Sequence, residues 1–196
     1  MRTLAIDTST AACSVALFVG DQLVDAAHRE IGRGHAERLV SMIAELDGGG
    51  RAQTILVGCG PGSFTGVRVG IAAARALALG WQGEVRGFNS LALVAAAADG
   101  DVLVVMDGGH GEWLIQPFGP AGVPRADHVS LTPDQAEQSF SGVIIGNRAI
   151  AYAERFGGAP VAALPNARDA LNIAAGQANW PPRPVYARAP DARMPA

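Results

Sequence analysis

The chain of 196 residues contains no lysine, since all fifteen of its basic residues are arginine. That absence excludes a Schiff-base lysine, a serine–lysine dyad and the lysine-containing phosphate loop of NTPases. Charge of either sign is also sparse, because Asp, Glu and Arg make up only 17% of the chain and the net charge is -3. A dedicated nucleic-acid-binding protein carries a clustered basic face, so this composition argues against that class.

Cysteine and histidine are equally scarce. Cys13 and Cys59 are the two cysteines, and both lie in apolar runs far apart in the chain. We expect two buried structural thiols in a reducing compartment. No two histidines are four residues apart, and the sequence contains neither an HExxH nor a CxxC motif, so we predict no metal site. The four histidines are His28, His35, His110 and His128.

Long hydrophobic runs are missing too. The first seven residues end in an acidic side chain, Asp7, which leaves no apolar region for a signal peptide. The longest apolar stretch, 69–81, includes Arg75 and is too short to span a bilayer. Hydrophobic residues nevertheless make up 49% of the chain, which suffices for it to fold alone. We expect a soluble, cytoplasmic protein without membrane contact.

The first hundred residues alternate between short β-branched runs and amphipathic segments. Leu39, Met42, Ile43 and Leu46 recur at spacings of three and four, which predicts a helix over 35–46. Three strands, helix, strand, helix, strand is the order of an RNase H-like α/β unit. The expected strands are 4–7, 13–19, 22–30, 54–59 and 84–88, and the expected helices are 35–46, 64–79 and 90–98.

The second half shows a thinner version of the same pattern. Thr132 is a suitable N-cap with Pro133 at the first helical position, which predicts a helix to about Ser139. We interpret the chain as tandem units, 1–100 and 101–196, each with a mixed sheet flanked by helices and the second reduced. The other expected elements are a hairpin of strands 102–107 and 112–118, a strand at 143–145, helices at 149–155 and 167–178, and an extended tail at 181–196.

A glycine-rich turn enters the long helix. Backbone N–H groups at a helix N-terminus can hold a phosphate, so Gly60, Gly62 and Ser63 are weak candidates for such a role. The turn lacks the lysine of a Walker A motif and the third glycine of the dinucleotide fingerprint, and Pro61 removes a donor. Ser63 also lacks the flanking glycines of a nucleophile elbow. The pattern does not favour phosphate binding.

Within that helix Gly66, Gly70, Ala74 and Ala78 recur every four residues and form one strip of small side chains. Glycine costs about 1 kcal/mol relative to alanine inside a helix, so the strip needs a reason. Two explanations are open. The strip packs against the protein's own sheet, or it lets a partner helix approach closely. We favour the second, with helices 35–46 and 64–80 forming a docking face for another protein.

Asp7 supports a competing hypothesis. A carboxylate at the end of a first strand can position magnesium or a water near a nucleotide phosphate, as in a small actin-like phosphotransferase or ATPase. The bland alternative is that Asp7 caps the turn through residues 8–10. If the chain were such a phosphotransferase or ATPase, a second phosphate loop would be expected near Asp107, where the sequence continues Gly-Gly-His-Gly-Glu. An ordinary hairpin turn explains that segment better.

Four segments resemble the TsaB (YeaZ) family, the dimerisation subunit of the bacterial tRNA threonylcarbamoyladenosine complex. They are Ile-Asp-Thr-Ser-Thr at 6–10, Cys-Ser-Val-Ala-Leu at 13–17, Gly-His-Ala-Glu-Arg-Leu at 34–39 and Gly-Pro-Gly-Ser-Phe-Thr-Gly-Val-Arg-Val-Gly at 60–70. The resemblance is specific over residues 1 to about 92. Further on, Pro-Val-Tyr-Ala-Arg at 184–188 is similar to the family's C-terminal signature, whereas the hairpin 107–113 departs from the family pattern.

The resemblance implies a tandem actin-like (ASKHA) fold and a non-catalytic scaffold. Such a subunit pairs with the catalytic homologue TsaD and the ATPase TsaE, which transfer a threonylcarbamoyl group to N6 of adenosine 37 of tRNAs. It implies no catalytic residue, cofactor or metal in this chain, with ATP and Mg²⁺ on the partner subunits and tRNA reached only through the complex. A homodimer is implied when TsaD is missing. The expected interface residues are His35, Leu39, Met42, Ile43, Leu46, Phe64, Gly66, Val67, Gly70, Ile71, Ala74, Arg75 and Ala78.

Overall fold

The computed structural model describes residues 1–136 and 140–187. Its first sheet has the strand order β3-β2-β1-β4-β5. The first three strands are antiparallel neighbours, while β4 and β5 run parallel to β1, as a crossover through a helix requires. The sheet is therefore mixed, as the sequence predicted. Its strands are β1 (Arg2–Asp7), β2 (Ala12–Val19), β3 (Gln22–Glu30), β4 (Thr54–Gly58) and β5 (Glu84–Phe88).

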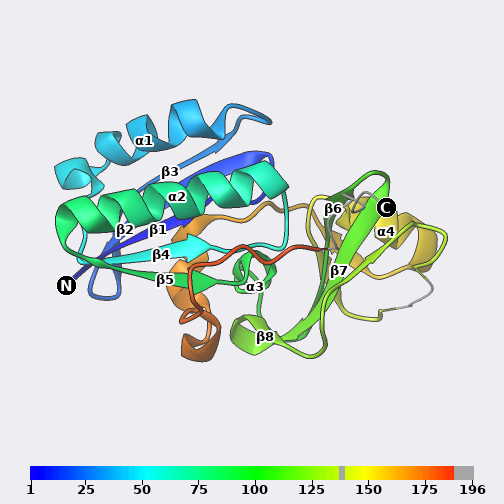
Figure 1. Cartoon of the computed structure of the whole chain (residues 1–196). Helices are drawn as coiled ribbons and strands as arrows, with labels where there is room; N and C mark the ends of the chain where they lie inside the picture. Colours follow the sequence, from blue (N-terminus) through cyan, green and yellow to red (C-terminus); the bar gives the residue numbers. More distant parts are fainter. Residues whose placement is uncertain (137–139, 188–196) are drawn as a thin grey trace.

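Two helices, α1 (His35–Glu45) and α2 (Phe64–Trp81), lie side by side over one face of this sheet (Figure 1). Leu39, Met42 and Ile43 are buried because their spacing puts them on the sheet side of α1. Ile6 and Val57 belong to the same core cluster. A short 3₁₀ turn, η1 (Asp47–Gly50), follows α1, and α2 ends two residues later than expected, where Gln82 adopts a left-handed conformation.

The second sheet has the order β11-β10-β6-β7-β8, with β9 also paired to β7. β6 is antiparallel to β7 and parallel to β10, which in turn is parallel to β11. Its helix α4 (Ala149–Phe156) follows β10 as α2 follows β4. The strands are β6 (Val102–Gly109), β7 (Glu112–Gly119), β8 (Val123–Pro124), β9 (Val129–Leu131), β10 (Val143–Ile145) and β11 (Ala159–Val161).

The two sheets repeat one connectivity, so the expected tandem mixed-sheet fold is confirmed. Strand β6 contributes side chains to two hydrophobic cores, because successive side chains of a strand point to opposite faces of the sheet. Val104 and Met106 join a cluster that also holds Ala5 and Leu56 of the first sheet. Val105 points the other way, into the cluster under α4. The helix α3 (Ser90–Ala95) lies in the shared core between the sheets.

The chain returns to the first sheet after the second one is complete. The expected helix over 167–178 is wrong, because this segment forms two 3₁₀ turns, η3 (Ala167–Asn172) and η4 (Ala175–Gln177). Ala167 and Ala170 are buried in the shared core, and the Ala167 N–H donates to Ser14 Oγ at 2.8 Å. Residues 167–172 therefore pack on the first unit rather than extending the second.

A strap, defined here as residues 180–187, then crosses the edge of the first sheet (Figure 1). Trp180 and Gly87 exchange two backbone hydrogen bonds of 2.9 and 2.7 Å, and the Val185 N–H donates to the Cys59 carbonyl at 2.7 Å. Residues 181–187 form no helix or strand, while the rest of the expected tail, 188–196, lies outside the described residues. So do residues 137–139 of the expected helix from Thr132, of which 133–135 form a turn.

Candidate functional site

Asp7 lies at the end of β1 and is sealed from solvent, with 1% of its surface exposed. Its Oδ1 accepts hydrogen bonds from the Ser9 N–H at 2.9 Å and the Ser9 hydroxyl at 2.7 Å. Oδ2 accepts from the Ser90 hydroxyl at 2.7 Å. Burial raises the pKa of the Asp7 carboxyl above 3.8, against the opposing effect of these hydrogen bonds and of His35. The carboxylate ties the first turn to the start of α3.

The glycine-rich turn closes on this carboxylate. The Gly60 N–H donates to Ser90 Oγ at 3.2 Å, the Ser63 N–H to the Ser9 carbonyl at 2.7 Å, and the Gly66 N–H to Ser63 Oγ at 3.2 Å. Gly62 is pressed against the same turn, since a Cβ there would clash with the Ser9 carbonyl. The structure thus brings the three weak phosphate candidates, Gly60, Gly62 and Ser63, close to Asp7, but the N–H groups of Gly60, Ser63 and Gly66 already donate within the chain.

The alternative that Asp7 caps the turn through residues 8–10 is confirmed, because the N–H and hydroxyl of Ser9 donate to its carboxylate. Sequence reasoning missed Ser90. Ser90 lies 83 residues from Asp7 and carries no local signal, so only the fold reveals their contact.

The strip of small residues on α2 faces the chain's own sheet, so the prediction that it receives a partner helix is wrong. A Cβ at Gly66 would collide with the Thr8 carbonyl, and a Cβ at Gly70 would lie 2.5 Å from Thr8 Oγ1. That hydroxyl donates to the Gly66 carbonyl at 2.7 Å. The glycines are needed because α2 crosses the end of β1 at close range. Ala74 and Ala78 continue the strip into the core.

Most of the other expected interface residues are buried as well. His35, for example, is 8% exposed, and its Nε2 lies 3.2 Å from the Ala12 carbonyl. The regularly spaced apolar residues of α1 therefore pack into the core of this chain and do not form an outward-facing surface. Phe64 and Arg75 are the two expected residues that stay exposed. The buried ones are His35, Leu39, Met42, Ile43, Leu46, Gly66, Val67, Gly70, Ile71, Ala74 and Ala78.

The solvent side of the two helices carries a different apolar set, which we call the helix-pair face. On α1 these exposed apolar residues recur every four residues, and on α2 they recur at spacings of four and three. Val40 is 57% exposed and Leu79 is 84% exposed. These residues could have been identified from the sequence, because they are apolar residues that recur at helical spacing outside the buried stripe of each helix. The helix-pair face consists of Ala36, Val40, Ala44, Ala72, Ala76 and Leu79.

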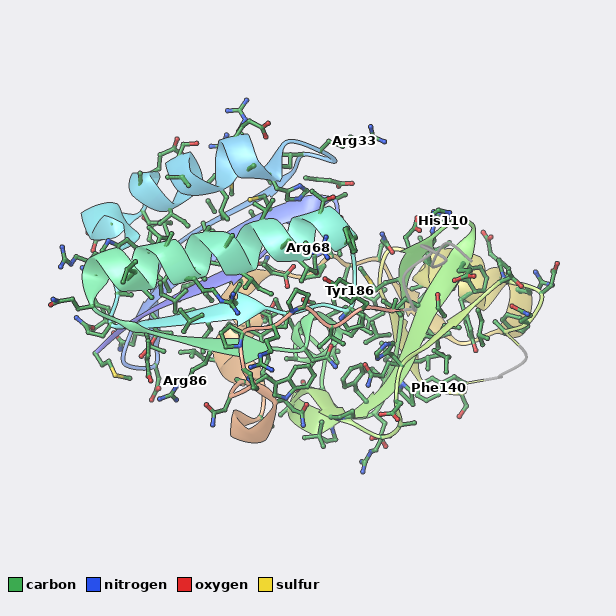
Figure 2. All side chains as sticks on the ribbon, viewed as in Figure 1. Arg33, Arg68, Arg86, His110, Phe140 and Tyr186 are labelled. Atoms are coloured by element: carbon green, nitrogen blue, oxygen red, sulfur yellow. The ribbon has the colours of Figure 1, made fainter. Side chains whose placement is uncertain are left out.

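The strap covers another flank of α2. Tyr186 stacks on Phe64, and the Arg68 guanidinium carbon lies 3.5 Å from the centre of the Phe64 ring. Figure 2 shows Arg68 and Tyr186 close together at the start of α2. Further along, Arg75 donates to the Pro182 carbonyl at 2.6 Å. Among the residues that the structure describes, nothing covers Ala72, Ala76 and Leu79, the part of the helix-pair face that lies on α2.

Asp107 lies two residues before the end of β6, whereas Asp7 is the last residue of β1, and the surroundings of the two carboxylates differ. Its side chain pairs with Arg148 and its Oδ1 accepts from the Gly109 N–H at 2.8 Å, which closes the hairpin. Asn147 Oδ1 accepts from the Asp107 N–H at 2.8 Å. The Asp107 side chain is 40% exposed, so it is not a second sealed carboxylate.

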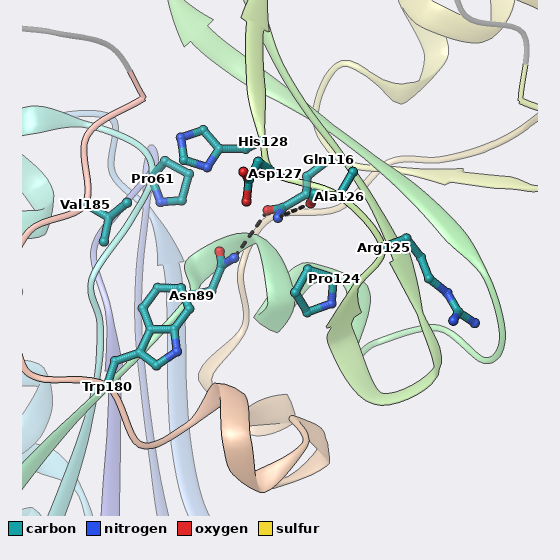
Figure 3. A pocket seen from close by; sticks show the side chains of 10 residues that line it. All are labelled: Pro61, Asn89, Gln116, Pro124, Arg125, Ala126, Asp127, His128, Trp180 and Val185. Carbon is teal, nitrogen blue, oxygen red and sulfur yellow. Dashed lines mark hydrogen bonds between the residues drawn. The ribbon is translucent and has the colours of Figure 1, made fainter.

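A cleft of about 530 Å³ opens between the two units (Figure 3). Asn89 and Trp180 line it from the first unit, and Gln116 and His128 line it from the second. Within residues 1–136 and 140–187, no three His, Cys, Asp or Glu side chains gather in a way that could hold a metal ion. No helix of that part of the chain has both the length and the apolar character to cross a membrane.

Residues 27–122 match the protein family described as TsaD, tRNA N6-adenosine threonylcarbamoyltransferase. A curated relative, the tRNA threonylcarbamoyladenosine biosynthesis protein TsaB of Escherichia coli, is 44% identical over 103 residues. That alignment covers 50% of this chain and 44% of the E. coli protein, so less than half of that relative's length is matched.

Solved structures match more of the chain. YeaZ from Pseudomonas aeruginosa superimposes with a TM-score of 0.77 at 31% identity, covering 94% of this chain and 99% of that one. The ethanolamine utilization protein EutJ from Carboxydothermus hydrogenoformans gives a TM-score of 0.53 at 12% identity, over 88% of this chain and 89% of that one. The second likeness concerns the fold alone.

Proposed function

The chain belongs to the TsaB/YeaZ family, and on that premise we propose that it is a non-catalytic scaffold subunit in tRNA threonylcarbamoyladenosine biosynthesis. In this role it holds a TsaD-like catalytic subunit, to which a TsaE-like ATPase is added. ATP and Mg²⁺ bind on those partners, and tRNA is reached through the complex. The name of the E. coli relative and the match of residues 27–122 to the TsaD family support the assignment.

The observation that carries the scaffold role is the uncovered helix-pair face. Val40 and Leu79 expose most of their surface to solvent although both are aliphatic. Ala72 and Ala76 are small and exposed, so a helix of a partner could approach α2 closely there. Exposed apolar residues on two neighbouring helices are compatible with a protein–protein contact. The proposal keeps the expected helix pair as the docking element and moves the contact to its outer residues.

The closed turn at Asp7 supports a scaffold over the competing phosphotransferase or ATPase. A phosphate would have to displace Ser9 and Ser90 from the carboxylate and from the amides that they occupy. We therefore expect no heat when the isolated chain is titrated with Mg-ATP in a calorimeter. Micromolar binding would favour the phosphotransferase instead.

Co-purification with the TsaD protein of the same organism tests the partner surface. Val40→Glu and Ala76→Glu each place a charge at the proposed contact, where desolvation without a partner charge is costly. Both positions are exposed, so folding stability should change by no more than about 0.5 kcal/mol. Each variant should lose co-purification while its melting curve stays unchanged.

Ile150→Glu is the matched control, because Ile150 is 53% exposed on α4 of the second unit. It should retain the partner. If both helix-pair variants bind TsaD as the unmodified chain does, this surface is not the interface. If both variants lose TsaD but the mixture of unmodified proteins shows no tRNA-modification activity, the interface assignment is supported and the assignment to this pathway is contradicted.

The same face also explains the proposed homodimer of the isolated chain. A second copy would cover the apolar side chains that TsaD covers in the complex, so the two assemblies should exclude one another. Analytical ultracentrifugation should show dimers that Val40→Glu converts to monomers and that added TsaD replaces with heterodimers.

A further inference from the structure

The cleft between the two units has walls suited to a flat ligand. Trp180 and Val185 of the strap form one side together with Pro61, and Pro124 lies opposite, beyond Asn89 (Figure 3). These are apolar surfaces, and an indole offers a face on which an aromatic ring can stack. The volume of about 530 Å³ falls in the range of small-molecule sites.

Two buried carboxamides supply hydrogen-bonding groups at the floor of the cleft. Asn89 and Gln116 are 3% and 4% exposed, and Asn89 Nδ2 donates to Gln116 Oε1 at 3.2 Å. Gln116 Nε2 donates to the Ala126 carbonyl at 2.9 Å. Each amide nitrogen carries two hydrogens and uses one of them in these bonds. The second hydrogen of each is left to donate to a ring nitrogen of a ligand.

The charge at the rim disfavours an anion. Asp127 lines the cleft and is exposed, whereas the Arg125 guanidinium points away and donates to Asp101 Oδ1 at 3.0 Å. Figure 3 shows that guanidinium on the far side of Pro124 from the cleft. A phosphate would meet a carboxylate without a compensating arginine. An amino group, in contrast, could donate to Asp127.

We propose that this cleft binds an uncharged, amino-substituted nucleobase, with the base stacked on Trp180 and its amino group donating to Asp127. The carboxamides of Asn89 and Gln116 donate to its ring nitrogens. The base comes either from a free nucleoside or from an unstacked position of single-stranded RNA, since both present the same edge. This inference is independent of the helix-pair face, none of whose residues lines the cleft.

Calorimetric titration of the full chain with adenosine tests the proposal. The ligand efficiency of small ligands suggests a dissociation constant of about 0.1 mM. Inosine lacks the amino group and should bind about tenfold more weakly, and AMP should also bind more weakly because of Asp127. Gln116→Met, which keeps the volume and removes the amide, should weaken adenosine binding. Asp127→Asn should reduce the preference for adenosine over AMP.

Asp21→Asn is the matched control, since Asp21 is exposed in the turn between β2 and β3. It should change nothing, and Val40→Glu should also leave adenosine binding intact. Equal affinity for adenosine and inosine, tighter binding of AMP, or no heat at millimolar adenosine would each overturn the proposal. A hexamer of oligoadenylate separates the sources. Binding that Gln116→Met weakens indicates a base presented by RNA, and binding of adenosine alone indicates a nucleoside site.

Discussion

The Tyr186 ring stacks on the Phe64 ring, with centroids 5.3 Å apart and planes inclined by 30°. Arg68 completes the contact, because its guanidinium lies over the Phe64 ring and its Nε donates to the Tyr186 hydroxyl at 3.1 Å. Residues 118 apart in the sequence are joined in this way. The strap is thus held where α2 begins, beside the turn that closes on Asp7.

Tyr186→Ala should lower the free energy of unfolding by about 1 kcal/mol, because it removes an aromatic stacking contact and a cation–π contact at a partly exposed position. Urea denaturation measures the change. Tyr186→Phe keeps the ring and removes only the hydroxyl that accepts from Arg68, so it should cost less. Equal losses in the two variants would mean that the hydrogen bond, and not the stacking, holds the strap.

Gly66→Ala and Gly80→Ala should move stability in opposite directions although both glycines lie in α2. A methyl group at position 66 meets the Thr8 carbonyl, so overpacking should cost about 1–3 kcal/mol. No atom lies within 4 Å of a Cβ at position 80, so alanine there should add about 0.5–1 kcal/mol through helix propensity. Thermal melts of both variants measure the difference. A neutral Gly66→Ala would show that α2 can shift away from β1.

The glycines of α2 also show how much of the fold can be predicted from the sequence. Periodicity predicted the strands of the first unit and the helices at α1 and α2 because local patterns determine them. It could not say which side of α2 faces the sheet, since Gly66 and Gly70 are compatible with close packing against either a strand or a partner helix. The contact with Thr8 decides this, and that contact joins residues 58 apart.

The second unit was harder to predict for a related reason. The 167–178 segment has helical composition, yet Ala167 and Ala170 turn into the shared core over the first sheet, and the segment breaks into 3₁₀ turns there. Tertiary burial outweighs intrinsic propensity in such short segments. The cleft was not visible in the sequence at all, because Asn89, Gln116 and Trp180 come from three distant parts of the chain.

Cys59 should react slowly with thiol reagents in the native protein. Burial raises the pKa of its thiol from 9.0 to about 11, which lowers the thiolate fraction near pH 8 about a hundredfold. Tyr186→Ala should increase its alkylation rate, because the strap hydrogen-bonds to the Cys59 carbonyl through Val185. Cys13, buried inside β2, serves as the internal control and should keep its rate. Peptide mass spectrometry after timed alkylation distinguishes the two thiols. Parallel acceleration at both would indicate global unfolding rather than strap release.

Asp7 should make the protein less stable as the pH rises above the ordinary carboxyl range. Burial raises its pKa in the folded chain, whereas the unfolded chain titrates near 3.8. Between those two values the folded state binds more protons, so the free energy of unfolding falls with rising pH and then levels off above the folded pKa.

Asp7→Asn removes this titration, so the stability of the unmodified protein minus that of the variant should decline from about pH 4 upward. Urea denaturation across this pH range measures the difference, and subtraction cancels the effect of Asp169, whose pKa burial also raises. Ser90→Ala should steepen the decline, because the Ser90 hydroxyl donates to Oδ2 and favours the carboxylate. A difference that grows with pH would show that the hydrogen bonds from Ser9 and Ser90 outweigh burial. The turn at Asp7 would then be built around a stable anion.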